Sequence, residues 1–198
     1  MQRQMLDLLE ITTGQSFPTP FQLEIDLDPI LIEAARAALP DGPSYIGLSP
    51  GAGGLPKCWP LEKFIELARQ QVSLGRQPVF ILGPQELDWH KEIAAAVPEA
   101  LFPLQDKGLG AVHKFAPALT MALAQRLALA VSNDSGTGHM FATGGAKLIS
   151  LFGRTVPEKF TPMAASLTII RAQDYGGREM HFIPVETVAE AIEAVLAG

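Results

Sequence analysis

Cysteine is almost absent from this sequence, because Cys58 is the one cysteine in 198 residues. A single thiol cannot form a disulfide within the chain, and the first residues show neither the basic nor the apolar segment of a secretory leader. We therefore expect a cytosolic protein in a reducing compartment. A metal site is not expected either, since the histidines are scattered and none has a second ligand at metal-binding spacing.

Basic residues are outnumbered as well. The 15 lysines and arginines face 21 acidic residues, which gives a net charge of −6 and an isoelectric point near 5.2. Nucleic acid is therefore not an expected partner, because it would require a concentrated cationic surface. The most apolar stretch, 116–131, contains Gln125 and Arg126 and is shorter than the roughly 20 residues of a bilayer span. No transmembrane segment is predicted.

Apolar and turn-forming residues are plentiful. Hydrophobic residues make up 47% of the chain, with 18 glycines and 16 prolines, so a sizeable core with many turns is expected. Short apolar runs without polar alternation, each followed by an amphipathic segment, predict parallel strands covered by helices. The strands are expected at 45–49, 78–82, 127–132, 148–152 and 167–171. The helices are expected at 2–11, 29–39, 61–74, 85–96, 117–126, 137–143 and 185–196.

This pattern predicts an α/β fold, a Rossmann-like doubly wound parallel sheet with helices on both faces. The domain is expected to span 41–198, whereas 1–40 is interpreted as an N-terminal helix, a linker and a lead-in helix. Ligands of such sheets bind beyond the carboxyl ends of the strands. The loops that follow the strands are therefore where a site is expected. They are 49–60, 83–89, 133–139 and 153–162.

The first loop joins a strand end at Ser49 to the start of a helix and is rich in glycine. Gly51, Gly53 and Gly54 let backbone amides approach an anion closely, and Lys57 supplies a mobile positive charge just before the helix. This arrangement indicates a phosphate cradle. Its spacing matches neither GxGxxG nor GxxxxGK[ST], so a long turn with a solvated lysine is the alternative interpretation.

The third loop also follows a buried strand and opens a helix. Ser135, Gly136, Thr137 and His139 would present amides and side chains to the same crevice, where two helix N-termini favour a diphosphate. Asp134 would repel a phosphate unless it binds something else, such as sugar hydroxyls. Its alternative role is to cap the short helix.

Two further interpretations concern acidic residues. A hydrolase triad of Asp134, Ser135 and His139 is disfavoured, because a nucleophile elbow reads GxSxG and His139 is badly placed as a base for Ser135. Glu86 comes three residues after the strand-ending Gly83, where Rossmann-type folds often place an acid that binds ribose hydroxyls. The alternative for Glu86 is a first-turn glutamate that stabilises the helix dipole.

Four short motifs occur in order, each at the end of a predicted strand. They are Ser-Pro-Gly-Ala at 49–52, Lys-Cys-Trp-Pro at 57–60, Asp-Ser-Gly-Thr-Gly-His-Met-Phe-Ala at 134–142, and Leu-Phe-Gly-Arg-Thr-Val-Pro at 151–157 with Pro162. Together they resemble glycosyltransferase family 9, whose best known members are the ADP-heptose:lipopolysaccharide heptosyltransferases. The sequence departs from the family at Cys58, where an arginine is frequent.

The resemblance implies a GT-B arrangement of two Rossmann-like halves, of which this chain corresponds to the carboxyl-terminal one. Lys57 would contact the diphosphate of a nucleotide sugar, and Glu86 would bind its ribose. Asp134 to Gly136, together with Thr137 and His139, would hold phosphate and sugar. No metal or other cofactor is implied. The acceptor half with its aspartate base is expected to be missing, so catalytic residues are unassigned and activity of the isolated chain stays open.

The expected function is donor binding in an inverting glycosyltransferase of cell-envelope glycan or lipopolysaccharide synthesis. The donor is a nucleotide diphosphate sugar, with an ADP-sugar such as ADP-heptose favoured, and the location is cytoplasmic or peripheral at the inner membrane. The alternative is a non-catalytic nucleotide-binding or assembly module that has lost its acceptor domain. Such a module would work through a partner domain or as a homodimer, because the half-interface would leave apolar surface exposed.

Overall fold

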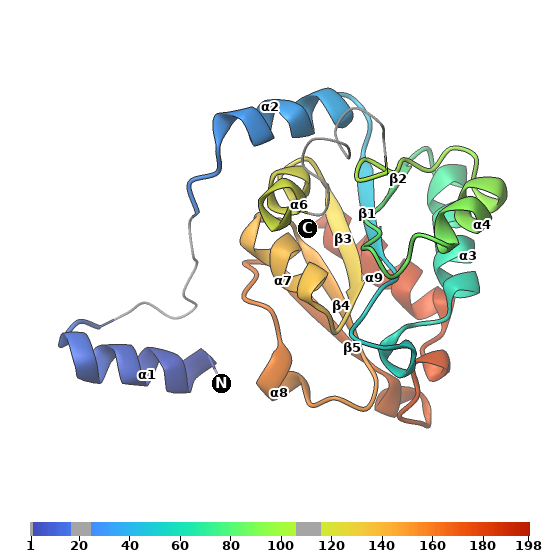
Figure 1. The fold of residues 1–198 in the computed structure, drawn as a ribbon. Helices are drawn as coiled ribbons and strands as arrows, with labels where there is room; N and C mark the ends of the chain where they lie inside the picture. The colour runs from blue at the N-terminus through green and yellow to red at the C-terminus, as the bar shows by residue number, and fades with distance from the viewer. Residues whose placement is uncertain (1, 17–24, 106–115) are drawn as a thin grey trace.

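The computed structural model describes residues 2–16, 25–105 and 116–198, and its centre is a parallel sheet (Figure 1). Five strands of the described chain pair in the order β2-β1-β3-β4-β5. Every neighbouring pair is parallel, which confirms the predicted Rossmann-like α/β class. The strands are β1 (Tyr45–Ser49), β2 (Gln77–Phe80), β3 (Leu129–Asn133), β4 (Leu148–Phe152) and β5 (Leu167–Arg171).

Helices lie on both faces of this sheet (Figure 1). One face carries α3 (Leu61–Ser73), α4 (Trp89–Ala96) and α9 (Val185–Ala197), and the other carries α2 (Pro29–Ala38), α6 (Pro117–Ala124) and α7 (Gly136–Thr143). Shorter helices lie in loops that follow strands. They are α8 (Pro157–Phe160) and the 3-10 helices η1 (Leu55–Lys57), η2 (Ala172–Tyr175) and η3 (Met180–Phe182).

The core forms two apolar clusters because successive side chains of a strand point to opposite faces. Ile46 and Leu48 of β1 belong to the cluster that contains Phe64 of α3. Tyr45 belongs to the cluster that contains Leu31 of α2. Strands β1, β3 and β4 are buried along their whole length, which explains why their sequences are continuous apolar runs.

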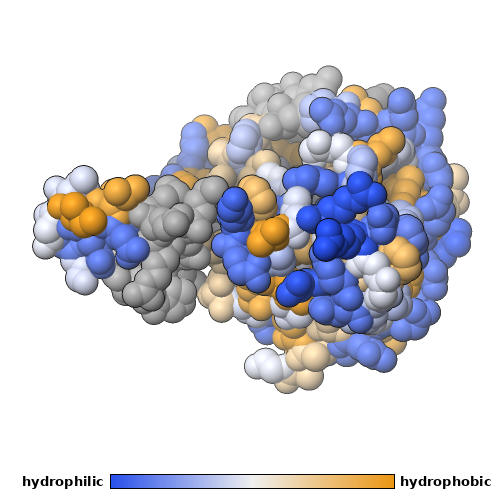
Figure 2. Space-filling model, turned by 90° about the horizontal axis from the view of Figure 1, so that it is seen from below, coloured by the Kyte–Doolittle hydropathy of each residue, from blue (hydrophilic) through white to orange (hydrophobic). Residues whose placement is uncertain are grey.

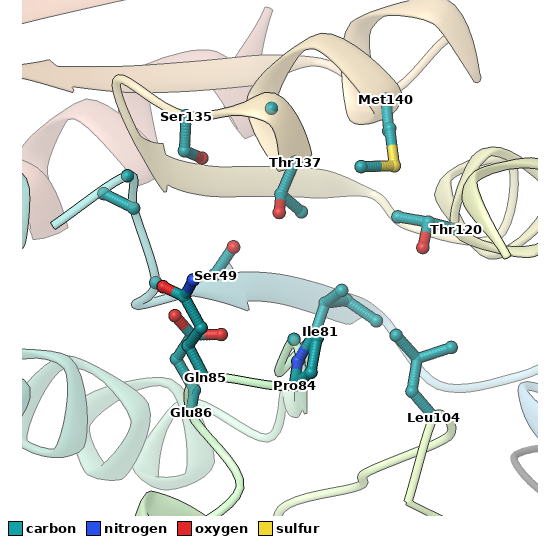
Figure 3. A pocket seen from close by; sticks show the side chains of 15 residues that line it. Ser49, Ile81, Pro84, Gln85, Glu86, Leu104, Thr120, Ser135, Thr137 and Met140 are labelled. Atoms are coloured by element: carbon teal, nitrogen blue, oxygen red, sulfur yellow. The ribbon is translucent and has the colours of Figure 1, made fainter. Parts of the chain in front are cut away.

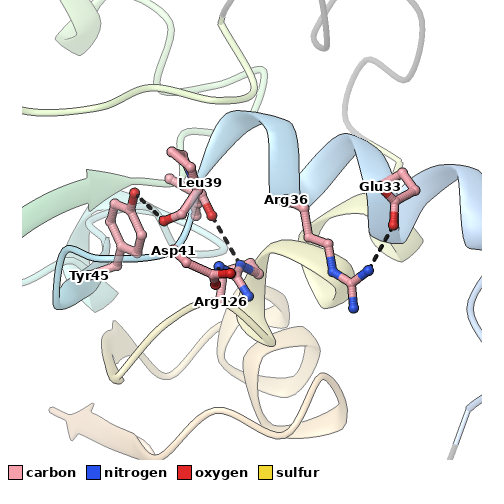
Figure 4. A network of polar contacts seen from close by, with 7 residues as sticks. Glu33, Arg36, Leu39, Asp41, Tyr45 and Arg126 are labelled. Carbon is pink, nitrogen blue, oxygen red and sulfur yellow. Dashed lines mark hydrogen bonds and ion pairs between the residues drawn. The ribbon is translucent and has the colours of Figure 1, made fainter.

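The carboxyl end of α2 is joined to the sheet by a small polar network (Figure 4). Arg126 donates from Nε to the carbonyl oxygen of Leu39 at 3.0 Å and pairs with the carboxylate of Asp41. The Tyr45 hydroxyl donates to the carbonyl oxygen of Pro40 at 2.9 Å. These contacts fix the entry into β1 and so help to fix the position of the loop that follows it.

Helix α1 (Gln2–Thr13) precedes this body and carries the exposed apolar side chains Leu8, Leu9 and Ile11. Residues 17–24 of the predicted linker lie outside the described residues. The domain boundary at 40 stays a prediction, and α2 packs against α6. Among the helices of the described ranges, none has both the length and the apolar character to cross a membrane.

Several predicted boundaries differ from the structure, and the difference between β2 and α4 matters for the site. The strand predicted at 78–82 ends at Phe80, and the helix predicted from residue 85 begins at Trp89. A turn in which the amide of Glu86 donates to the carbonyl of Gly83 at 3.2 Å fills the gap. Glu86 therefore lies before the helix, and its alternative role as a first-turn glutamate was wrong.

The winding of the chain reverses between β1 and β3. From β1 the chain moves outward to the edge strand β2 and then returns to β3 on the other side of β1. The loops after β1 and β3 therefore leave adjacent strands in opposite directions. Such a switch point opens a crevice beyond the carboxyl ends of the strands, which we call the carboxyl edge.

Candidate functional site

A pocket of about 300 Å³ opens at this switch point (Figure 3). Both glycine-bearing loops predicted to converge contribute to it. The loop after β1 provides Ser49, Gly51, Ala52 and Gly53, the segment after β2 provides Ile81 and residues 83–86, and the start of α7 provides Ser135, Gly136, Thr137 and Met140. Leu104 and Thr120 complete the lining.

The pocket has a polar end and an apolar end (Figure 3). Ser49, Glu86 and Ser135 lie at the polar end, near the carboxyl ends of β1 and β3. Leu104 and Met140 lie at the other end. An elongated pocket with this gradient suits a ligand that is charged at one end and flat and apolar at the other.

Asn133, the last residue of β3, holds the β1 loop in place. Its fully buried side chain donates from Nδ2 to the carbonyl oxygens of Pro50 at 2.7 Å and Gly51 at 3.4 Å, and its Oδ1 accepts from the amide of Trp59 at 2.9 Å. One amide group thus ties both ends of the loop to the neighbouring strand. The Trp59 indole donates to the carbonyl of Ile183 at 3.0 Å, which anchors the end of the loop to the body.

Lys57 and Asp134 form an ion pair between the two loops. Lys57 Nζ lies 3.3 Å from Asp134 Oδ2, and the carboxylate side chain is only 9% exposed whereas the lysine side chain is 43% exposed. The lysine thus offsets a buried charge that would otherwise repel a phosphate. Helix α7 has Ser135 at its N-cap position, so the alternative role of Asp134 as the helix cap was wrong.

The start of α7 leaves hydrogen-bonding groups free for a ligand. Ser135 makes no capping hydrogen bond with its side chain, and its buried Oγ has no partner among the described residues. The first amides of a helix lack acceptors within the helix and carry a partial positive charge. Ser135, Gly136 and Thr137 therefore form a site suited to an anion. The partnerless hydroxyl of Ser135 also argues against the hydrolase triad.

Glu86 lies within the pocket wall and is tightly enclosed. It is 8% exposed, and burial raises the pKa of its carboxyl, opposed only in part by backbone hydrogen bonds at Gly83 and Glu86. A methyl group on Gly51 would lie 2.5 Å from the carboxyl carbon, and one on Gly83 would lie 2.7 Å from Oε2. The two glycines therefore leave room for the carboxylate in the position it occupies.

Comparison with known proteins identifies the family. The family model of glycosyltransferase family 9 (heptosyltransferase) matches residues 3–182. This chain belongs to that family. One curated relative is lipooligosaccharide heptosyltransferase 2 of Haemophilus influenzae. It is 30% identical over 142 residues, and the matched region covers 70% of this chain and 39% of the relative. Lipopolysaccharide heptosyltransferase 2 of Escherichia coli is 26% identical over 163 residues, which cover 80% of this chain and 46% of that relative.

Solved structures of family 9 share the fold. The E. coli ADP-heptose lps heptosyltransferase II superposes with a TM-score of 0.73 at 24% identity, covering 91% of this chain and 56% of that one. The E. coli heptosyltransferase WaaC with ADP gives a TM-score of 0.72 at 20% identity, and the superposition covers 96% of this chain and 54% of that one. This family 9 chain thus spans about half the length of the relatives it matches.

Of the predicted site residues, Lys57, Asp134 and His139 are not among the residues that line the pocket at the switch point of this family 9 chain. Of these, His139 is exposed on α7.

Cys58 lines a separate pocket of about 220 Å³ with Arg154 and His181. Burial and the nearby Glu86 carboxylate raise the pKa of its thiol, so the neutral thiol is favoured at this position. Among the described residues no group of three or more His, Cys, Asp and Glu side chains is arranged to hold a metal ion.

Substituting glutamine for Glu86 is expected to stabilise the fold at about pH 8 and change little at about pH 4. Because burial raises the pKa of Glu86, its carboxyl is neutral and does not destabilise the folded state at low pH. As the pH rises through the folded pKa, the carboxyl ionises inside the protein and the folded state loses stability. The glutamine side chain of the variant does not titrate, so the variant does not lose this stability. Urea denaturation at both pH values measures the effect, with the exposed Glu92→Gln of α4 as control. An equal gain at both pH values would contradict this account.

Proposed function

We propose that this domain binds the nucleotide diphosphate sugar donor, an ADP-sugar such as ADP-heptose, of an inverting heptosyltransferase of lipopolysaccharide synthesis. The observation that carries the proposal is that the loop of Gly51 and the start of α7 at Gly136 line one pocket. Two solved relatives are described as heptosyltransferase WaaC with ADP and with ADP-2-deoxy-2-fluoro heptose. The same proposal assigns the protein to the cytoplasm, with at most a peripheral position at the inner membrane.

The pocket accommodates the parts of such a donor in order. The flat base fits the apolar end beside Leu104 and Met140, and the ribose hydroxyls reach Glu86, which accepts their hydrogen bonds. The diphosphate then meets the amides at the start of α7. Lys57 is not among the lining residues, but it pairs with Asp134, which directly precedes the lining residue Ser135. Asp134 is left to accept from sugar hydroxyls beyond the phosphates.

In glycosyl transfer the bond between the sugar carbon and the diphosphate oxygen breaks, and the nucleoside diphosphate leaves with the bonding electrons. Charge therefore grows on the phosphate oxygens in the transition state. Lys57, held beside Asp134, and the α7 amides would stabilise that charge and so lower the barrier. The base that deprotonates the acceptor is expected from the other half of the enzyme.

Calorimetric titration with ADP, AMP, UDP and GDP tests the proposal. ADP is expected to bind at least about tenfold more tightly than AMP, because a charge-assisted hydrogen bond to the second phosphate contributes about 1.5 kcal/mol or more. ADP is also expected to bind more tightly than UDP, because a pyrimidine fills less of the apolar end. Equal affinity for ADP and AMP, or no binding of any of the four, would overturn it.

Turnover separates this function from the alternative of a binding or assembly module. The surface seen from the carboxyl edge is mostly hydrophilic, with small apolar areas set among polar ones (Figure 2). That character suits a face turned toward a sugar more than a homodimer interface. Transfer of sugar in the presence of an acceptor-binding half supports the enzyme, and binding of ADP-sugar without transfer under that condition supports the module.

A further inference from the structure

The ammonium group of Lys57 has a second neighbour besides Asp134. Its Nζ lies 5.7 Å from the centre of the Phe160 ring, on the last residue of α8. This distance is within the range in which an aromatic ring attracts a cation. Three loops, which follow β1, β3 and β4, therefore meet at one lysine.

The backbone around Phe160 is fixed although its ring is 40% exposed. Pro157 at the start of α8 and Pro162 just beyond its end are both buried. The ring of Pro162 lies 3.7 Å from the position that a Cβ on Gly138 of α7 would occupy. The amide of Thr161 donates to the carbonyl of Pro157 at 2.8 Å. These contacts hold the turn that carries the Phe160 ring on both sides.

A ring and a carboxylate act differently on the lysine. Asp134 attracts the ammonium through its opposite charge, so the carboxylate competes with a phosphate for the same group. The ring of Phe160 attracts the ammonium without carrying a net charge. A lysine side chain has four rotatable bonds, and confining it beforehand reduces the entropy lost when it binds an anion.

We propose that Phe160 is a positioning residue for Lys57, which helps to hold the ammonium beside Asp134 and the start of α7, where the proposed function places the diphosphate. This role rests on the proposed function. The ring acts through the lysine and does not need to touch the donor. Its effect is therefore expected only in chains that retain Lys57.

A double-mutant cycle measured by calorimetry with ADP tests the role. Phe160→Leu is expected to weaken ADP binding about two- to fivefold, the effect of an exposed cation–π contact. Phe160→Tyr, which keeps an aromatic face, is expected to restore the affinity. In the Lys57→Ala background, Phe160→Leu is expected to change nothing. The same loss in both backgrounds would overturn the proposal.

A second measurement is independent of the ligand. The methylene protons next to Nζ of Lys57 are expected to be shifted by the ring current of Phe160, and this NMR shift should vanish in Phe160→Leu and persist in Phe160→Tyr. The Lys57→Ala variant identifies the signal by its loss. If the shift is present but ADP does not bind the wild-type chain, the donor proposal fails and the contact stands. If the shift is absent, the positioning role is overturned.

Discussion

Replacing Lys57 by alanine is expected to weaken ADP binding about ten- to a hundredfold, or 1.5 to 3 kcal/mol, the usual contribution of a hydrogen bond to a charged group. Two effects combine. The diphosphate loses its ammonium partner, and the buried Asp134 carboxylate loses the charge that offsets it. The uncompensated carboxylate then repels the phosphates. Calorimetric titration with ADP measures the loss.

Two matched variants make this result interpretable. Lys91→Ala removes an exposed lysine of α4 and changes the net charge equally, so it is expected to bind ADP as the wild type does. Asp134→Asn in the Lys57→Ala background is expected to recover part of the affinity, because it removes the repelling charge. Unchanged affinity in Lys57→Ala would rule out the phosphate role of this lysine.

The largest expected loss of stability follows from Asn133→Ala. The substitution leaves the amide of Trp59 and the carbonyl of Pro50 without partners in a buried position. Each of the two unsatisfied groups costs about 1–3 kcal/mol, so the free energy of unfolding is expected to fall by about 2–6 kcal/mol. Urea denaturation followed by tryptophan fluorescence measures it.

The neighbouring Ser132 provides the control for this prediction. Its Oγ is buried like the Asn133 side chain but has no hydrogen-bond partner among the described residues. Ser132→Ala is therefore expected to change stability little, since no hydrogen bond is lost. Asn133→Asp keeps the shape but places an acceptor against the carbonyl of Pro50, and it is expected to be destabilising too. Equal stability of the Asn133→Ala and Ser132→Ala variants would contradict the anchoring role.

The strand-end loops could be identified from the sequence because local patterns determine where parallel strands end. Buried strands read as apolar runs, and the polar residues that stop them lie at the carboxyl edge. Asn133 was missed as a functional residue because its partners lie 74 to 83 positions away along the chain. Its local signal, a polar residue ending a buried strand, was visible, but the acceptors it binds were not.

The side chains of the two loops show the same limit. Thr137 and Met140 are three residues apart and share the helix face that lines the pocket, whereas His139 lies on the opposite face. Helical spacing was sufficient to foresee this difference once the helix start was known. The sequence suggested a conflict between Asp134 and a phosphate, and the structure resolves it with an ion pair to Lys57.

The close fit of Glu86 between two glycines limits how the proposed donor preference could be altered by engineering. A side chain larger than hydrogen at Gly51 or Gly83 would displace the Glu86 carboxylate from its present position, so a substitution at either glycine also changes the placement of this acid. Leu104 and Thr120 line the distant end and are free of this constraint. Libraries that aim to exchange one nucleobase for another should therefore vary Leu104 and Thr120 and keep the glycines fixed.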